Sequence, residues 1–253
     1  MSLSQFALIG LAGFATGAVN ALAGGGSLIS FPVLLAMGVP PLSANVTNTI
    51  GLCPGYLGAA LAQRRDLHHQ AARLYVLLPI AVACSVGGAL LLLHTGEQAF
   101  GRAVPWLILG ACVLLSVQQR LRGWLERREA ARAGVSLALA LPLVGAANVY
   151  GGYFGAGASV IVLAALGLSY TDTLPRLNAL KQALSLATNC AAALLFAVSG
   201  PVHWRIVPVL AAGALVGGAW GGRLGRRLSP PLLRRVVVVL GLIVAAIYLW
   251  RAR

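Results

Sequence analysis

Long apolar stretches recur from one end of the chain to the other, at 3–23, 74–93, 104–117, 184–198 and 236–250. A helix needs about 20 mostly apolar residues to span the hydrocarbon core of a bilayer. Only 9% of the 253 residues are charged, which is too few polar groups to cover the surface of a water-soluble fold. The sequence therefore predicts an all-α polytopic membrane protein with about eight to ten transmembrane segments.

The net charge of +14 has two explanations. In a soluble protein it would favour nucleic acid as a partner, but basic residues in a membrane protein first of all set its orientation in the bilayer. We therefore expect a lipid bilayer and no nucleic acid around this chain.

Two copies of one unit are visible about 130 residues apart. The segment "LLAMGVPP" at 34–41 matches "LAALGLSY" at 163–170, and each follows a glycine-rich segment, "AGGGS" at 23–27 and "GGYFGAGAS" at 151–159. Further on, "SVGGAL" at 85–90 matches "LVGGAW" at 215–220. These matches predict a first transmembrane repeat at 1–117, a basic cytoplasmic connecting loop at 118–134, and a second transmembrane repeat at 135–253.

Each repeat is expected to hold about five segments. Two of them, 27–38 and 156–168, are too short to cross a core of about 30 Å unaided at about 1.5 Å per residue. They are either half-helices that re-enter the membrane or crossings in a locally thinned region. The expected segments are 3–23, 27–38, 43–62, 72–93 and 102–118, followed by 135–150, 156–168, 175–198, 205–224 and 232–250.

The basic residues favour an inverted second repeat. An odd number of segments per repeat, with the N-terminus outside, places 14 of the 19 Lys and Arg residues on the cytoplasmic face. This agrees with the enrichment of Lys and Arg in the cytoplasmic loops of membrane proteins. An even number would put the basic stretch 223–235 outside. The 14 residues are Arg64, Arg65, Arg73, Arg120, Arg122, Arg127, Arg128, Arg132, Arg176, Arg223, Arg226, Arg227, Arg234 and Arg235.

The paired glycine breaks are the candidate substrate site. Broken helices near the membrane midplane expose backbone groups, and an N-terminal helix end attracts anions. Close helix packing through small residues is the alternative, above all for the second break. We expect Ser27 to cap the second helix, and Asn20 and Asn148 either to line the site or to bond a neighbouring helix. The residues of the two breaks are Gly24, Gly25, Gly26 and Ser27, and Gly155, Gly157 and Ser159.

Polar side chains form a stripe on one face of the expected helix 175–198, and a shorter stripe lies on 43–62. A lysine inside a membrane helix costs roughly 2.5 to 3.5 kcal/mol on insertion scales, which makes Lys181 a functional candidate. Its long stem could instead reach the inner headgroups. The first stripe is Asn178, Lys181, Gln182, Ser185, Thr188 and Asn189, and the second is Asn45, Asn48, Thr49 and Tyr56.

The five acidic residues, Asp66, Glu97, Glu126, Glu129 and Asp172, all fall outside the apolar segments. We therefore expect no catalytic residue, metal site or cofactor, and no carboxylate relay within the membrane. The pattern favours a secondary transporter of a small anion, with a proton or a sodium ion as candidate coupling ion. An anion channel and, less favoured, an integral-membrane enzyme are the alternatives, and the oligomeric state is open.

The two copies "GGGSLISFPVLLAMGVPP" and "GAGASVIVLAALGLSY" resemble the sulfite exporter TauE/SafE family of membrane permeases. The resemblance covers nearly the whole chain. It implies a multi-pass protein of the bacterial inner membrane that transports small anions such as sulfite, sulfoacetate or other organosulfur or organic anions. The second copy has Ser169 and Tyr170 where the first has Pro40 and Pro41, so the two breaks need not be equivalent.

Overall fold

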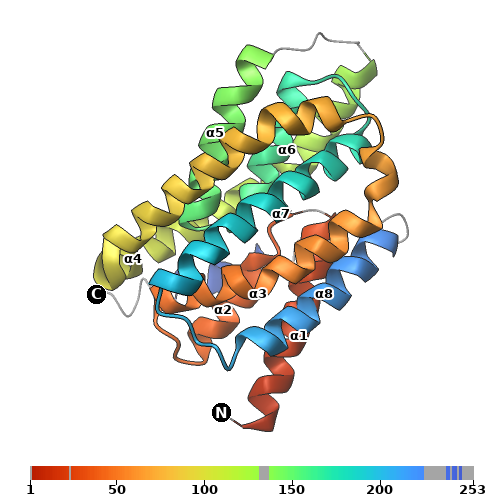
Figure 1. The fold of residues 1–253 in the computed structure, drawn as a ribbon. Coiled ribbons are helices and arrows are strands. Elements are labelled where there is room, and N and C mark those ends of the chain that lie inside the picture. The colour runs from red at the N-terminus through yellow and green to blue at the C-terminus, as the bar shows by residue number, and fades with distance from the viewer. Residues whose placement is uncertain are drawn as a thin grey trace.

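The computed structural model describes residues 2–22, 24–130, 137–224, 238–239, 241–243 and 245–246. Every regular element in these ranges is a helix, and Figure 1 shows the helices packed side by side in one elongated bundle. They are α1 (Leu3–Leu22), α2 (Ser27–Ala36), α3 (Pro41–Ala62), the short 3-10 helix η1 (Arg64–Leu67), α4 (Ala71–Ala130), α5 (Leu137–Tyr153), α6 (Ala158–Ser169), α7 (Leu174–Ser199) and α8 (Val207–Leu224).

Most predicted segments are confirmed to within a few residues, because glycine and proline mark their ends. α3 begins at Pro41 and α7 has Pro175 in its first turn, positions where the missing N–H of proline has no helical partner to lose. The expected helix at 232–250 lies for the most part outside the described residues.

One difference concerns α4, which joins the two expected helices 72–93 and 102–118. Within α4, the backbone leaves helical geometry only at Gly96, where φ is 73° and ψ is 168°. Glycine adopts this positive φ without a steric penalty, so a single residue replaces the expected loop. The expected connecting loop at 118–134 also differs, since it is helical as far as Ala130 and its residues 131–136 lie outside the described ranges.

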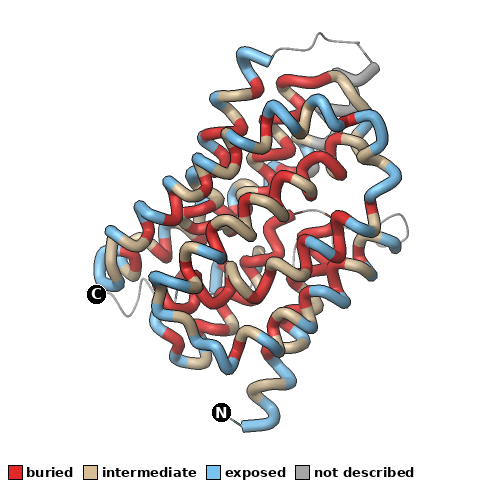
Figure 2. Tube along the Cα trace, in the orientation of Figure 1, coloured by how far each residue is buried: buried red, intermediate tan, exposed pale blue. Residues whose placement is uncertain are grey.

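Three described helical stretches are long and apolar enough to span a membrane, Leu3–Leu22, Ala71–Gln118 and Leu174–Ser199. The 48 residues of Ala71–Gln118, bent at Gly96, suffice for two crossings. Large apolar side chains also lie exposed on the outer faces of the bundle, among them Leu194 at 71% and Val198 at 84%. Figure 2 shows this exposure along the outer edges of the helices and the buried residues between them. The chain is therefore an all-α polytopic membrane protein.

The two halves of the chain exchange their fourth helix. α8 packs against α1 and α3 of the first half, whereas the part of α4 before Gly96 packs against α5 and α7 of the second. Glycines permit the close approach: a Cβ at Gly55 of α3 would lie 2.9 Å from the carbonyl oxygen of Ala214, and Gly88 of α4 faces the carbonyl of Val149. The inverted orientation of the two repeats remains a prediction.

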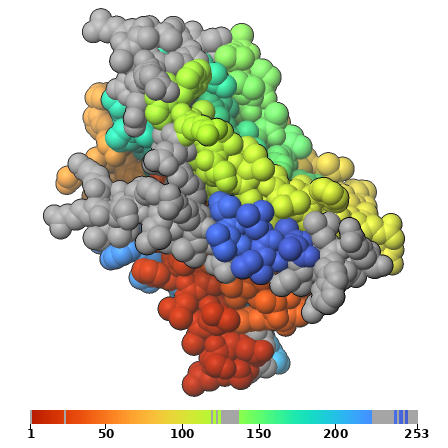
Figure 3. Space-filling model, turned by 180° about the vertical axis from the view of Figure 1, so that it is seen from behind, coloured from red at the N-terminus to blue at the C-terminus, as the bar shows by residue number. Residues whose placement is uncertain are grey.

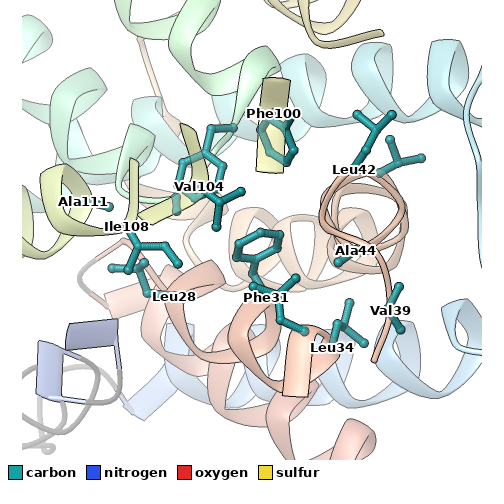
Figure 4. Close-up of a cluster of buried hydrophobic side chains, with 14 of the residues drawn as sticks. Leu28, Phe31, Leu34, Val39, Leu42, Ala44, Phe100, Val104, Ile108 and Ala111 are labelled. Carbon is teal, nitrogen blue, oxygen red and sulfur yellow. The ribbon is translucent and has the colours of Figure 1, made fainter. Parts of the chain in front are cut away.

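The short helix α2 is anchored by its apolar side chains. Leu28 and Phe31 point toward the second part of α4, where Phe100, Val104 and Ile108 lie, and Leu34 lies beside Val39 and Ala44 (Figure 4). The rings of Phe31 and Phe154 also meet edge to face, with centroids 5.4 Å apart. This core holds the first glycine break against α4. Figure 3, which shows the opposite face of the molecule, places the yellow second part of α4 beside the described residues between 238 and 246, in blue.

The two ends of the bundle differ in charge. At one, which we call the basic end, Asp172 forms ion pairs with Arg73 and with Arg176, the latter at 3.3 Å, and Arg64, Arg65 and Arg223 lie around one hollow. At the opposite end, Glu97 accepts a hydrogen bond from the N–H of Leu42 at 3.1 Å, and Arg102 lies exposed one to two turns further along α4 from it. The basic end brings together five arginines that the sequence assigns to the cytoplasmic face. Which face of the membrane this end occupies remains a prediction.

Candidate functional site

The first glycine break closes on itself. Gly24 and Gly25 have φ values of 82° and 81°, which turn the chain between α1 and α2. The N–H of Gly26 donates a hydrogen bond to Oδ1 of Asn20 at 2.7 Å, and the hydroxyl of Thr16 donates one to the carbonyl oxygen of Gly26 at 3.0 Å. Asn20 therefore supports the turn from the preceding helix.

The prediction that Ser27 caps α2 is wrong. Gly26 occupies the N-cap position, and Ser27 is the first residue of the helix, with no side-chain capping bond. The side chain of Asn20 reaches the start of α2 from the preceding helix and accepts a hydrogen bond from the N–H of Gly26, the N-cap residue itself.

The two breaks meet at one point. A Cβ placed on Gly24 would lie 2.7 Å from Cβ of Ser159, well inside the contact distance of two carbon atoms. Gly24 thus lets the end of α1 touch the start of α6. Gly25 lies in turn against the side chain of Leu115 in α4.

The second break borders a cavity. Gly155 and Gly157 both have φ of 79°, and Gly157 is the left-handed N-cap of α6. The hydroxyl of Tyr150 donates a hydrogen bond to the carbonyl oxygen of Ala156 at 2.7 Å, which holds the turn in place. Asn148, the counterpart of Asn20, donates instead to the carbonyl of Val144 in its own helix at 2.7 Å.

The cavity is small, polar and enclosed by five helices. Its volume is about 20 Å³, room for one water molecule. Tyr56, Ser159 and Asn189 all line it, so α3, α6 and α7 meet there. The polar side chains around the cavity are Tyr56 of α3, Ser85 of α4, Asn148 of α5, Ser159 of α6, and Ser185, Thr188 and Asn189 of α7, with Gly151 and Gly155 beside them. We call this the central cavity.

The start of the α7 stripe binds the end of α1. Nε2 of Gln182 donates to the carbonyl oxygen of Asn20 at 2.9 Å, and Nδ2 of Asn178 donates to that of Ala21 at 3.3 Å. Because α1 ends at Leu22, these carbonyls lack the helical N–H partners of residues further along. The two amides of α7 thus cap a broken helix.

Lys181 lies on α7 between these two amides. It is one of the largest fully buried side chains, with an exposed fraction of 0%. A lysine that reached the headgroups would extend its ammonium to the protein surface. The enclosed side chain therefore disagrees with that alternative and keeps Lys181 inside the bundle, between Asn178 and the residues of the central cavity.

The α3 stripe contributes less than the sequence predicts. The hydroxyl of Thr49 donates to the carbonyl oxygen of Asn45 in its own helix at 2.9 Å. Nδ2 of Asn45 donates to the carbonyl of Tyr153, at 3.0 Å, so it joins α3 to the second break. Asn48 is buried, and its Oδ1 has no hydrogen-bond partner among the described residues. Of this stripe, only Tyr56 borders the central cavity.

A second, much larger hollow opens at the basic end. Its volume is about 950 Å³. Asn178 lies on its wall, and Lys181, Gln182 and Ser185 follow along α7 toward the central cavity. We call this hollow the vestibule. Its polar and charged lining consists of Gln63, Arg64, Arg65 and Asp66 beside α3, Asn178 of α7, and Arg223 of α8.

Two polar residues near the site escaped the sequence analysis. Ser85 donates to the carbonyl oxygen of Thr188 at 3.0 Å, and Gln63 accepts a hydrogen bond from Asn178 at 2.6 Å. Ser85 is a single polar residue in an apolar helix, and Gln63 stands at the start of the charged run Arg64 to Asp66, which the sequence explains as a loop. The "SVGGAL" match marked the helix of Ser85 but gave no reason to single out its hydroxyl.

Apolar outer faces, broken helices and an enclosed polar cavity together define a membrane transport protein. The particular family follows from comparison. The chain belongs to the sulfite exporter TauE/SafE family, whose model matches residues 9–248. The resemblance noted in the sequence is thereby confirmed.

Relatives carry names of the same kind. A probable membrane transporter protein of Haemophilus influenzae is 27% identical over 246 residues, 97% of this chain and 95% of the relative. The probable membrane transporter protein YfcA of Escherichia coli K12 is 26% identical over 93% of this chain and 85% of its own length. ORF9 of a Sinorhizobium species, also named a probable membrane transporter protein, is 25% identical over 97% and 92%. The comparison with solved structures gave no significant match.

Proposed function

We propose that this chain is a secondary transporter of small anions whose path runs along the polar face of α7. The main support is the central cavity, where the first turn of α6 meets the hydroxyl and amide groups of α3, α5 and α7. The N-terminal end of a helix carries a partial positive charge, and hydroxyl and amide groups donate hydrogen bonds to anionic oxygens. Lys181 lies on the same helix face and, when protonated, adds a positive charge there.

The substrate class is a sulfur-containing or organic anion, such as sulfite or sulfoacetate. The family is named for sulfite export. The arginines of the vestibule support an anion over a cation, because basic residues around a polar hollow attract negative charge. A proton or a sodium ion is the candidate coupling ion.

Flux in proteoliposomes tests this proposal. The purified protein is reconstituted, and uptake of sulfite, sulfate, sulfoacetate, taurine and acetate is compared with that of empty liposomes. We expect saturable uptake of at least one anion and a change of rate when a proton or sodium gradient is imposed. Flux that rises linearly with concentration and ignores both gradients would favour an anion channel. Vesicles that match empty liposomes for every anion would contradict the proposal.

The chain is also proposed to lie in the bacterial inner membrane with its N-terminus outside and the basic end in the cytoplasm. Single cysteines at His68, at the basic end, and at Gln98, near the opposite end, can test this in a background without the native cysteines. We expect an impermeant thiol reagent added to intact cells, with a permeabilised outer membrane, to label H68C at least tenfold more slowly than Q98C. The reverse order would show the opposite orientation.

A further inference from the structure

The vestibule and the central cavity lie along the same helix but are separate. Asn178 borders the vestibule and Ser185 borders the central cavity. Ser185 follows Asn178 by seven positions, which corresponds to about 10 Å along α7. Any anion that moves between the two spaces along this face must pass the side chains that pack between them.

Three groups from three parts of the fold close the floor of the vestibule. Gln63, the C-cap residue that follows α3, accepts a hydrogen bond from Nδ2 of Asn178 at 2.6 Å. Its own Nε2 donates to the carbonyl oxygen of Ala21 at 3.2 Å, and Asn178 donates to the same oxygen at 3.3 Å. We call this triangle the clasp. It ties α3 and α7 to the broken end of α1.

The clasp is made of groups that can exchange their partners for water. All its bonds join neutral amides, and each such bond contributes only about 0.5 to 1.5 kcal/mol net. Oδ1 of Asn178 is buried without a hydrogen-bond partner among the described residues, so the closed arrangement already leaves one acceptor unsatisfied. Water that enters from the vestibule would satisfy this oxygen. The free-energy difference between the closed clasp and a hydrated, open one is therefore small.

We propose that Gln63 and Asn178 form the gate between the vestibule and the central cavity. This inference rests on the proposed transport function. Closed, as in this structure, the clasp prevents an anion in the vestibule from reaching Lys181 and the cavity. Open, it exposes the polar face of α7 to the arginine-lined hollow.

Thiol accessibility tests the gate without any knowledge of the substrate. In a chain with all four native cysteines replaced by alanine, Ser185→Cys places a reporter in the central cavity. The probe is 2-sulfonatoethyl methanethiosulfonate, a membrane-impermeant anion, applied to vesicles of each orientation. We expect Gln63→Ala to raise the labelling rate of the reporter at least tenfold, and only in vesicles that present the basic end to the probe.

Gln70→Ala provides a matched control. Gln70 is also a buried glutamine, and its Nε2 also donates to backbone carbonyls, those of Asp66 at 2.8 Å and Arg176 at 3.0 Å, but it does not border the vestibule. Its replacement should leave the labelling rate of the reporter unchanged. Asn178→Ala is the second gate variant, and we expect the same rise in labelling from it. It replaces Gln63→Ala in the experiment if that variant does not fold.

Equal labelling rates in the parent chain and in a folded gate variant would overturn the gate, as would an equal rise in Gln70→Ala. Transport assays decide the proposed function separately. If the protein transports no anion but the gate variants still show the selective rise in labelling, the clasp is a barrier and the proposed transport function is wrong.

Discussion

Gly24→Ala is expected to reduce transport more than tenfold, because this residue sits where the two glycine breaks touch. The new methyl group would lie 2.7 Å from Cβ of Ser159, which is attached directly to the backbone of α6 and cannot rotate away. The end of α1 and the start of α6 must then separate. The first turn of α6 borders the central cavity, so this shift displaces groups of the proposed site.

Gly38→Ala separates this contact from simple backbone strain. Gly38 has a φ of 81°, against 82° for Gly24, but no atom lies within 4 Å of a Cβ placed there. Both variants therefore incur the same left-handed backbone penalty of about 1 to 2 kcal/mol. We expect a lower melting temperature for both and a loss of transport only for Gly24→Ala. Similar transport rates in the two variants, at matched amounts of folded protein, would show that the contact has no role in function.

Lys181→Met is expected to weaken anion binding at least tenfold, about 1.4 kcal/mol. Methionine keeps most of the length and the apolar stem of lysine but removes the charge. The side chain is fully buried on the polar face of α7, where a positive charge attracts an anion far more strongly than it would in water. Titration calorimetry with the anion that the proteoliposome panel identifies measures the change.

Lys181→Arg is the companion variant. It keeps the positive charge in a larger, planar group, so we expect it to retain part of the affinity while fitting less well. If charge is what matters, affinity follows the order Lys, Arg, Met. Equal affinities for the wild type and Lys181→Met, measured on monodisperse protein, would remove Lys181 from the binding site.

The local features of the site could be predicted from the sequence. The contiguous glycines at 24–26 separate α1 from α2, and Gly155 and Gly157 separate α5 from α6. Both breaks lie where the sequence predicts them. Backbone conformation at such points depends mainly on the residue itself, since glycine alone adopts positive φ at no steric cost.

The roles of the individual polar residues could not be predicted in the same way. Asn20 and Asn148 occupy similar places before a glycine break, yet one holds the N–H of Gly26 and the other lies beside the central cavity. Gln63 looks like an ordinary polar residue at a helix end until α7 is placed beside it. The partner of each amide comes from a distant part of the chain, and local spacing contains no information about it.

The sequence by itself determined that this chain is a helical membrane protein with two glycine breaks and a polar stripe on α7, because segment length, apolar composition and the conformational freedom of glycine are local properties. Only the tertiary structure decided which break borders the cavity, that Lys181 is enclosed, and that α8 and the first part of α4 pack against the opposite halves. These outcomes depend on how side chains from five helices fill one space. That is a property of the packed bundle, in which the fit of each helix depends on all the others.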